Sequence, residues 1–171
     1  MYSGGLRIRL INDNLISFVR DGLTDLGWFE TDRHHKPVSV INEGLNWEEE
    51  AEPNIVAVTA EHVQEFEAEM GSNLADHTWQ FYVDVYGESE SVALHLATDI
   101  RDMLSGRMSS IGYTKPSLNV YDRTQATPPL IFTCDIEDIE MDKSRFEAKP
   151  FRYSWWVIAF TISDQYGDES D

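Results

Sequence analysis

Two stretches of the chain repeat apolar residues with the period of an amphipathic helix. In residues 6–26 the apolar side chains recur at steps of three, four and one positions, which gives a wide apolar stripe. Gly27 follows directly and suits a left-handed C-terminal cap. In residues 92–104 one face is again apolar, and Ser89 or Ser91 can serve as the N-cap. The pattern therefore predicts two helices.

Other stretches alternate apolar and polar residues, as half-buried strands do. The clearest is 79–85, and the short apolar stretches at 38–41, 55–58 and 118–121 also predict strands. Residues 60–70 fit an edge strand with a charged outer face, but their Glu and Ala content also fits a helix.

The C-terminal third predicts two longer strands. The first begins at Leu130, and its apolar parity shifts after Ile136, which predicts a β-bulge near Asp138. The second covers 151–162 and is apolar on both faces in its later half, as expected of a central strand or one buried by a neighbouring subunit. Together the elements predict an α+β fold in which two helices pack on one face of a largely antiparallel or mixed sheet of about six strands.

The length and composition fit one globular domain. The chain has 171 residues, of which 42% are hydrophobic and 12% aromatic, values typical of a folded domain rather than of a disordered segment. No internal repeat or linker divides the sequence, so we expect a single domain over 1–171, with an acidic, frayed tail at 164–171.

The charge balance excludes some partners. The chain has 13 Lys and Arg against 31 Asp and Glu, a net charge of −18. Such a surface disfavours nucleic-acid phosphates and anionic membranes, because both bind through Lys and Arg. It can line a path through which DNA passes, it can mimic DNA, or it can serve solubility alone, and solubility has the greatest prior weight. We see no signal peptide or apolar run of membrane-spanning length and expect a soluble protein made in the cytoplasm.

Candidate catalytic and metal-binding residues are few. The pair His34 and His35 lacks the spacing of a zinc site, and His95 lies beside the apolar stripe of the second helix. The carboxylates from Asp135 to Asp142 are best explained as a solvated strand face, and Cys134 as a small buried apolar residue. Nucleotide-binding and nucleophile-elbow motifs are missing from the sequence, so we expect no catalytic residue, no metal and no cofactor.

An interaction surface has better support. Trp28 and Trp47 lie in predicted polar loops, where an exposed aromatic residue is typical of a protein–protein contact, although either could equally fold back onto the domain edge. The scarce cations would meet acidic patches of a neighbouring subunit. The predicted interface residues are Trp28, Trp47, Arg107, Arg123, Lys143, Arg145, Phe146 and Lys149.

One segment resembles a known family. The strand ending in VDVYGE and the helix ALHLATDIRDMLSGR, within residues 79–107, are similar to the strand–helix core of tail terminator proteins from phages with long, non-contractile tails. The order of the N-terminal helix, the short strands around Pro53 and the C-terminal strand pair is also similar.

The resemblance implies a structural virion protein of the phage tail or neck, assembled in the host cytoplasm. It implies a homo-oligomeric ring, usually a hexamer, that caps the tail-tube protein and meets the head-completion or connector protein while DNA passes through the lumen. A head-closure or head–tail joining protein is the first alternative. A DNA-mimic inhibitor and a small hydrolase that uses the acidic strand follow in that order.

Overall fold

The chain folds as two helices on a six-stranded mixed sheet, which confirms the predicted α+β class. The computed structural model describes residues 4–30, 35, 37–42, 53–67, 74–144 and 154–167, with the backbone alone at the ends of several strands. The elements in chain order are α1 (Gly4–Asp25), β1 (Val38–Asn42), β2 (Asn54–Glu67), β3 (Leu74–Gly87), α2 (Glu90–Leu104), the short 3-10 helix η2 (Ser109–Ile111), β4 (Ser117–Tyr121), β5 (Leu130–Lys143) and β6 (Ser154–Gly167).

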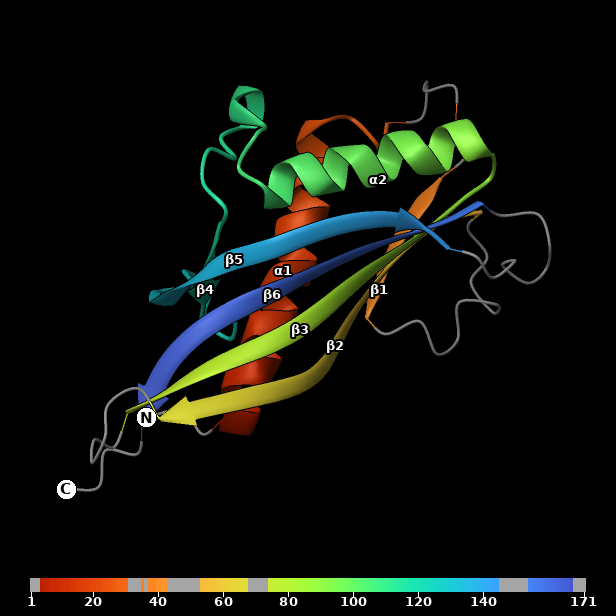
Figure 1. The fold of residues 1–171 in the computed structure, drawn as a ribbon. Helices are drawn as coiled ribbons and strands as arrows, with labels where there is room; N and C mark the ends of the chain where they lie inside the picture. Colours follow the sequence, from red (N-terminus) through yellow and green to blue (C-terminus); the bar gives the residue numbers. More distant parts are fainter. Residues whose placement is uncertain are drawn as a thin grey trace.

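The sheet is curled, and its strands follow the order β1-β2-β3-β6-β5-β4 (Figure 1). Only the β1–β2 pair is parallel, and the other neighbours run antiparallel. The final strand β6 lies between β3 and β5, so the prediction of a central strand is confirmed. Residues 60–67 continue β2, which decides between strand and helix for that part of the 60–70 segment.

Both helices cover the same face of the sheet. In Figure 1, α1 lies behind the sheet and α2 runs along its upper end. One core cluster joins the two helices to alternate residues of the strands. On β3 and β6, for instance, Phe81 pairs with Phe160 and Val83 with Ile158, and all four side chains are fully buried on this helix-covered face. The opposite face, which we call the bare face, has no helix packed on it among the described residues.

The helix ends follow the predicted capping signals. Gly27 has φ +77°, and the backbone N–H of Trp28 donates to the carbonyl of Leu23, which closes α1 with a left-handed cap. Ser89 is the N-cap of α2, and its hydroxyl accepts a hydrogen bond from the N–H of Val92. These signals fix where α1 ends and where α2 begins, and therefore where each helix meets the sheet.

The predicted β-bulge is present in β5. The register with β6 shifts between Glu137 and Glu140, and Asp138 has a left-handed backbone with φ +52°. Before the bulge Ile136 faces Ile162, and after it Met141 faces Ile158, so the apolar side chains stay on the helix-covered face. The bulge therefore keeps the carboxylates Asp135, Glu137, Glu140 and Asp142 on the bare face.

Candidate functional site

The bare face carries a line of acidic side chains along β5. We call this line the acidic ridge; it consists of Asp135, Glu137, Asp138, Glu140 and Asp142. All five residues are exposed. The four outside the bulge pair directly with Ser163, Thr161, Ala159 and Val157 of β6, which alternate with the buried core positions of that strand.

Two of the side chains next to the ridge are short hydroxyls. The Thr161 hydroxyl lies 3.3 Å from Asp138 Oδ2, and the Ser163 hydroxyl lies 3.4 Å from Glu137 Oε2. These hydroxyls donate to carboxylates without neutralising their charge. The ridge therefore presents negative charge to solvent.

A sixth carboxylate, Asp84 on β3, extends the acidic character of the bare face. It accepts a hydrogen bond of 2.9 Å from the indole N–H of Trp155. Burial raises the pKa of this carboxyl above its usual value, and the indole hydrogen bond only partly opposes the shift. Tyr86 stacks on Trp155 at 5.2 Å between ring centroids, and its own pKa is raised, first by burial and then by the charge of Asp84.

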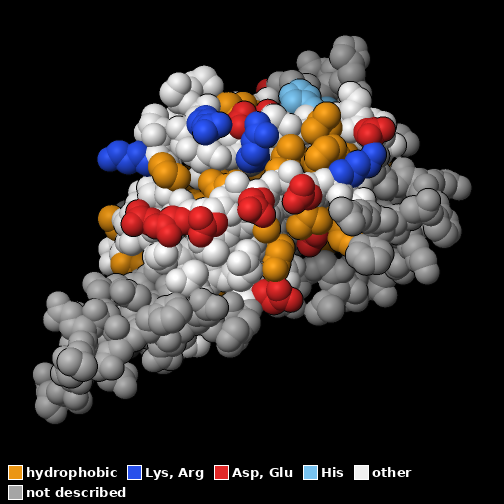
Figure 2. Space-filling view, in the orientation of Figure 1, with side chains coloured by type: hydrophobic (Ala, Val, Ile, Leu, Met, Phe, Trp, Pro, Cys, Tyr) orange, Lys and Arg blue, Asp and Glu red, His pale blue; other side chains and the backbone are white. Residues whose placement is uncertain are grey.

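The described cations lie outside the ridge, although Lys143 directly follows Asp142 in β5 and pairs with Glu90 of α2. Figure 2 shows the acidic side chains in a line along β5, with Lys and Arg side chains above that line. They come from α1, from α2 and the turn after it, from the two ends of β4, and from the end of β5. They are Arg7, Arg9, Arg20, Arg101, Arg107, Lys115, Arg123 and Lys143. The ridge is thus a run of carboxylates that no described cation interrupts, whereas α1 carries three Asp beside its three Arg. The bare face is suited to repel phosphate.

The same geometry offers little for acid–base or metal chemistry. Within the described residues, no three His, Cys, Asp or Glu side chains are grouped closely enough to hold a metal ion. His95 lies on the exposed surface of α2, 3.5 Å from Asp99 Oδ2, and its ring meets Trp28 edge-on. Cys134 is buried in the core, as predicted. His34 lies outside the described residues.

Of the two possibilities for Trp28, an exposed contact or a ring folded back onto the domain, the structure shows the second. The side chain is only 5% exposed, and its indole N–H donates to Asp99 Oδ2 at 2.8 Å. The residue directly follows the glycine cap of α1, and the cap turns the chain back so that the ring packs against α2. Trp28 therefore joins the two helices, the fold-back interpretation holds, and little of the indole is left for a partner to contact.

The other predicted interface residues are separated in space or not described. Arg107 and Arg123 are exposed on the turns after α2 and β4. Lys143 is already paired within the chain, since its Nζ lies 2.6 Å from Glu90 Oε1. Trp47, Arg145, Phe146 and Lys149 lie outside the described residues.

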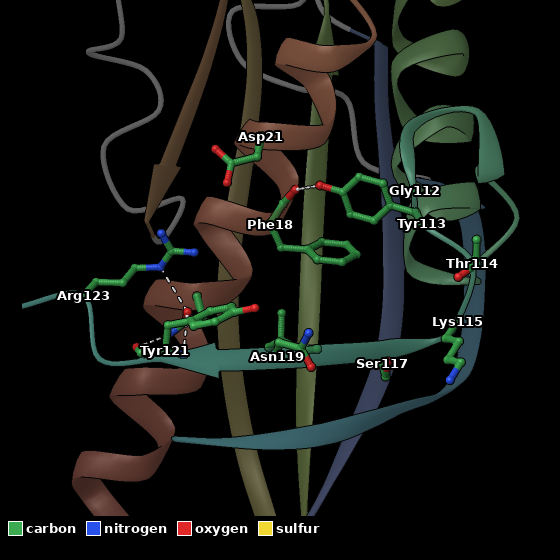
Figure 3. A pocket seen from close by; sticks show the side chains of 12 residues that line it. Phe18, Asp21, Gly112, Tyr113, Thr114, Lys115, Ser117, Asn119, Tyr121 and Arg123 are labelled. Atoms are coloured by element: carbon green, nitrogen blue, oxygen red, sulfur yellow. Dashed lines mark hydrogen bonds between the residues drawn. The ribbon is translucent and has the colours of Figure 1, made fainter. Parts of the chain in front are cut away.

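A groove at the β4 edge was not predicted from the sequence. It has a volume of about 340 Å³ and lies between α1 and the outer edge of β4 (Figure 3). Phe18 and Tyr113 form one wall, with their rings edge to face at 4.5 Å. The Tyr113 hydroxyl donates to the Phe18 carbonyl at 2.8 Å, and burial raises its pKa to about 12. The signal for this groove was weak, because its polar residues are scattered from position 14 to position 123.

Asn14 closes one end of the groove. It is 1% exposed on α1, and its side-chain amide binds the backbone of Tyr121 twice: Nδ2 donates to the carbonyl at 3.0 Å, and Oδ1 accepts from the N–H at 3.0 Å. The Arg123 Nε donates to the same Oδ1 at 3.0 Å. The side chain of Asn14 thus takes the place of a neighbouring strand at the end of β4.

Comparisons with known proteins add no assignment. No helix in the described part of the chain is both long and apolar enough to cross a membrane. A search against protein-family models finds no matching family, and a search of curated proteins finds no match to the sequence.

Proposed function

We propose that this protein is a non-enzymatic structural subunit of a bacteriophage tail, and specifically a tail terminator that forms a ring on the tail tube. The observation that carries the proposal is the acidic ridge on the bare face, a line of carboxylates that no described cation interrupts. The resemblance of residues 79–107 to the strand–helix core of tail terminators supplies the family. Tail-tube protein and a head-completion or connector protein are the partners it implies.

The acidic ridge suits a ring through which DNA must move. If the bare face lines the lumen, the ridge repels the phosphates and lowers the tendency of DNA to adhere during passage. Exposed cations such as Arg107 and Arg123 are then available to acidic surfaces of a neighbouring subunit or partner. A closed ring also uses the same contact between every pair of neighbours, so a few weak contacts are repeated.

The first experiment measures the molar mass of the purified protein by light scattering, at low and moderate salt, with and without tail-tube protein. The proposal predicts a ring, either alone or only in the presence of tubes. Because the contacts involve exposed charges, moderate salt should weaken the association. A protein that stays monomeric and does not bind tubes would contradict the proposal.

Charge variants of the ridge test the role of the bare face. Replacing Glu137 and Glu140 with Lys should leave ring formation intact but create DNA binding that weakens as salt rises. A matched control replaces both residues with Gln, which removes charge without adding cations and should not bind DNA. Loss of the ring in the Lys variant but not in the Gln control would instead place the ridge at a subunit contact.

A second candidate function is a DNA-mimic inhibitor. Four ridge carboxylates occupy one face of one strand, where alternate residues lie roughly 7 Å apart. A mimic would bind a DNA-binding enzyme and would lose that binding in the Gln control above. The tail terminator predicts no such competition with DNA, so one DNA-competition assay separates the two functions. Binding to filled heads rather than to tail tubes would favour a head-closure or head–tail joining protein.

A further inference from the structure

The outer edge of β4 has backbone groups that the fold leaves unpaired. The hydrogen bond from the Ile136 N–H to the Pro116 carbonyl sets the alternation of the β4–β5 pair. In this alternation the backbone N–H and carbonyl groups of Leu118 and Val120 point toward β5, and those of Asn119 and Tyr121 point away from β5. The Asn14 amide confirms this direction at Tyr121, because it binds that outward N–H and carbonyl.

Asn119 is the position where the edge is open. The residue is exposed, and among the described residues no hydrogen bond uses its backbone N–H or carbonyl. Its side chain is directed to the neighbouring strand, where Oδ1 accepts from the Thr133 hydroxyl at 2.9 Å. A donor and an acceptor of the backbone therefore face the groove beside α1, and in Figure 3 Asn119 lies between Lys115 and Arg123.

The charge of the groove is opposite to that of the chain. Lys115 and Arg123 lie at its two ends, and neither forms an ion pair with a described residue. Asp21 on α1 is the one carboxylate among the lining residues, so the lining has a net charge of +1 in a chain of −18. An extended segment that carries carboxylates is therefore favoured over one that carries amines.

We propose that this groove binds a short extended segment of a partner protein, which pairs with the backbone of Asn119 and places acidic groups near Lys115 and Arg123. The segment would add to β4 as an extra strand, a mode in which backbone hydrogen bonds give affinity and flanking groups give selectivity. The Phe18–Tyr113 wall offers an apolar contact for a side chain of the segment. The occupied length is short, because Asn14 already takes the place of the added strand at Tyr121. The inference does not depend on ring formation or on phage origin.

The test uses a fluorescein-labelled, end-capped peptide Glu-Val-Thr-Val-Glu and fluorescence anisotropy at low salt, with the full chain. The proposal predicts saturable binding, and a peptide with Lys in place of both Glu should bind at least about tenfold more weakly. The substitution Asn119→Pro removes the outward N–H, and proline is tolerated at such a position on an edge strand. It should weaken binding roughly tenfold, which corresponds to the loss of about one hydrogen bond. The control Asn119→Ala keeps the backbone groups and should bind within about twofold of the native chain.

Several outcomes would overturn the inference. They are the absence of binding, equal binding of the Lys peptide, and equal affinity of the Asn119→Pro and native proteins. Equal losses in Asn119→Pro and Asn119→Ala would assign binding to the side chain instead of the backbone. If Asn119→Pro does not fold, a peptide N-methylated at its central Thr provides the same test on the ligand side. The double variant Lys115→Gln, Arg123→Gln should reduce the difference between the Glu and Lys peptides.

Discussion

Replacing Trp28 tests whether this residue is part of the core or of an interface. Its indole is 5% exposed and donates to Asp99 Oδ2, and the Asp99 side chain is itself only 17% exposed. A hydrogen bond to a charged group contributes about 1.5–3 kcal/mol, and Phe also fills less of the space between the helices. We therefore expect Trp28→Phe to lower the free energy of unfolding by about 2–3 kcal/mol. Trp28→Ala should cost about 3–5 kcal/mol, as large-to-small core changes do.

The assay is urea unfolding at constant protein concentration, followed by circular dichroism. A loss of that size is a large part of the ~5–15 kcal/mol that stabilises a typical domain, so the midpoint should shift clearly. A double-mutant cycle with Asp99→Ala isolates the hydrogen bond, because the second substitution should cost much less once the indole N–H is absent. Asp99→Asn is the control, since its amide oxygen can still accept that bond.

The opposite pattern would refute this reasoning. If Trp28→Phe changed stability by less than about 0.5 kcal/mol but abolished self-association or binding to tail tubes, the indole would act at an interface. Its burial against α2 in the isolated chain would then have to be released on assembly.

Three further changes test particular parts of the fold. Because the pKa of Asp84 is raised in the folded state, its stabilising contribution is complete below the unfolded pKa and is lost as pH rises through the folded pKa. Asp84→Asn should therefore raise the melting temperature near pH 7, with a gain that shrinks toward pH 4 in scanning calorimetry. Asp138 has φ +52°, so Asp138→Gly should stabilise by about 0.5–1 kcal/mol and Asp138→Val should destabilise by about 1–2 kcal/mol in urea unfolding. A Cβ at Gly87 would lie 2.6 Å from backbone atoms of Ala93, so Gly87→Ala should cost about 1–3 kcal/mol in the same assay, whereas Gly5→Ala, with open space around it, should cost nothing.

The elements could be predicted from the sequence because each has a strong local signal. The apolar stripes of the helices, the glycine at the end of α1 and the serine before α2 act within a few residues of one another. The parity shift after Ile136 was sufficient to place the bulge, because a strand with one buried face must keep its apolar residues on that face. The bulge is also what brings the ridge carboxylates onto one face.

The residues that lie between elements were harder to predict. Trp28 follows the end of the helical apolar pattern and precedes a polar stretch of the sequence, and its burial depends on α2, more than 60 positions later. Asn14 falls on the predicted N-terminal helix as one polar residue among several, yet it binds Tyr121, 107 positions away. Such pairs form because a buried amide needs partners, and periodicity does not say which partners the fold will bring to it.

The position of α1 limits how these subunits can associate. Arg20 of α1 donates to the Val40 carbonyl on β1, and Asn14 binds Tyr121 on β4, so one helix contacts both edge strands of the curled sheet. Exposed edges favour uncontrolled strand pairing, and α1 reduces this at both edges.

Removing the amide with Asn14→Ala should lengthen the open part of β4 beyond Asn119. We therefore expect stronger concentration-dependent self-association of this variant in sedimentation velocity, with Asp13→Ala as the exposed control on the same helix. If Asn14→Ala loses stability but stays as monomeric as the control, the edge is protected by something other than this amide, and assembly must rely on side-chain and charge contacts.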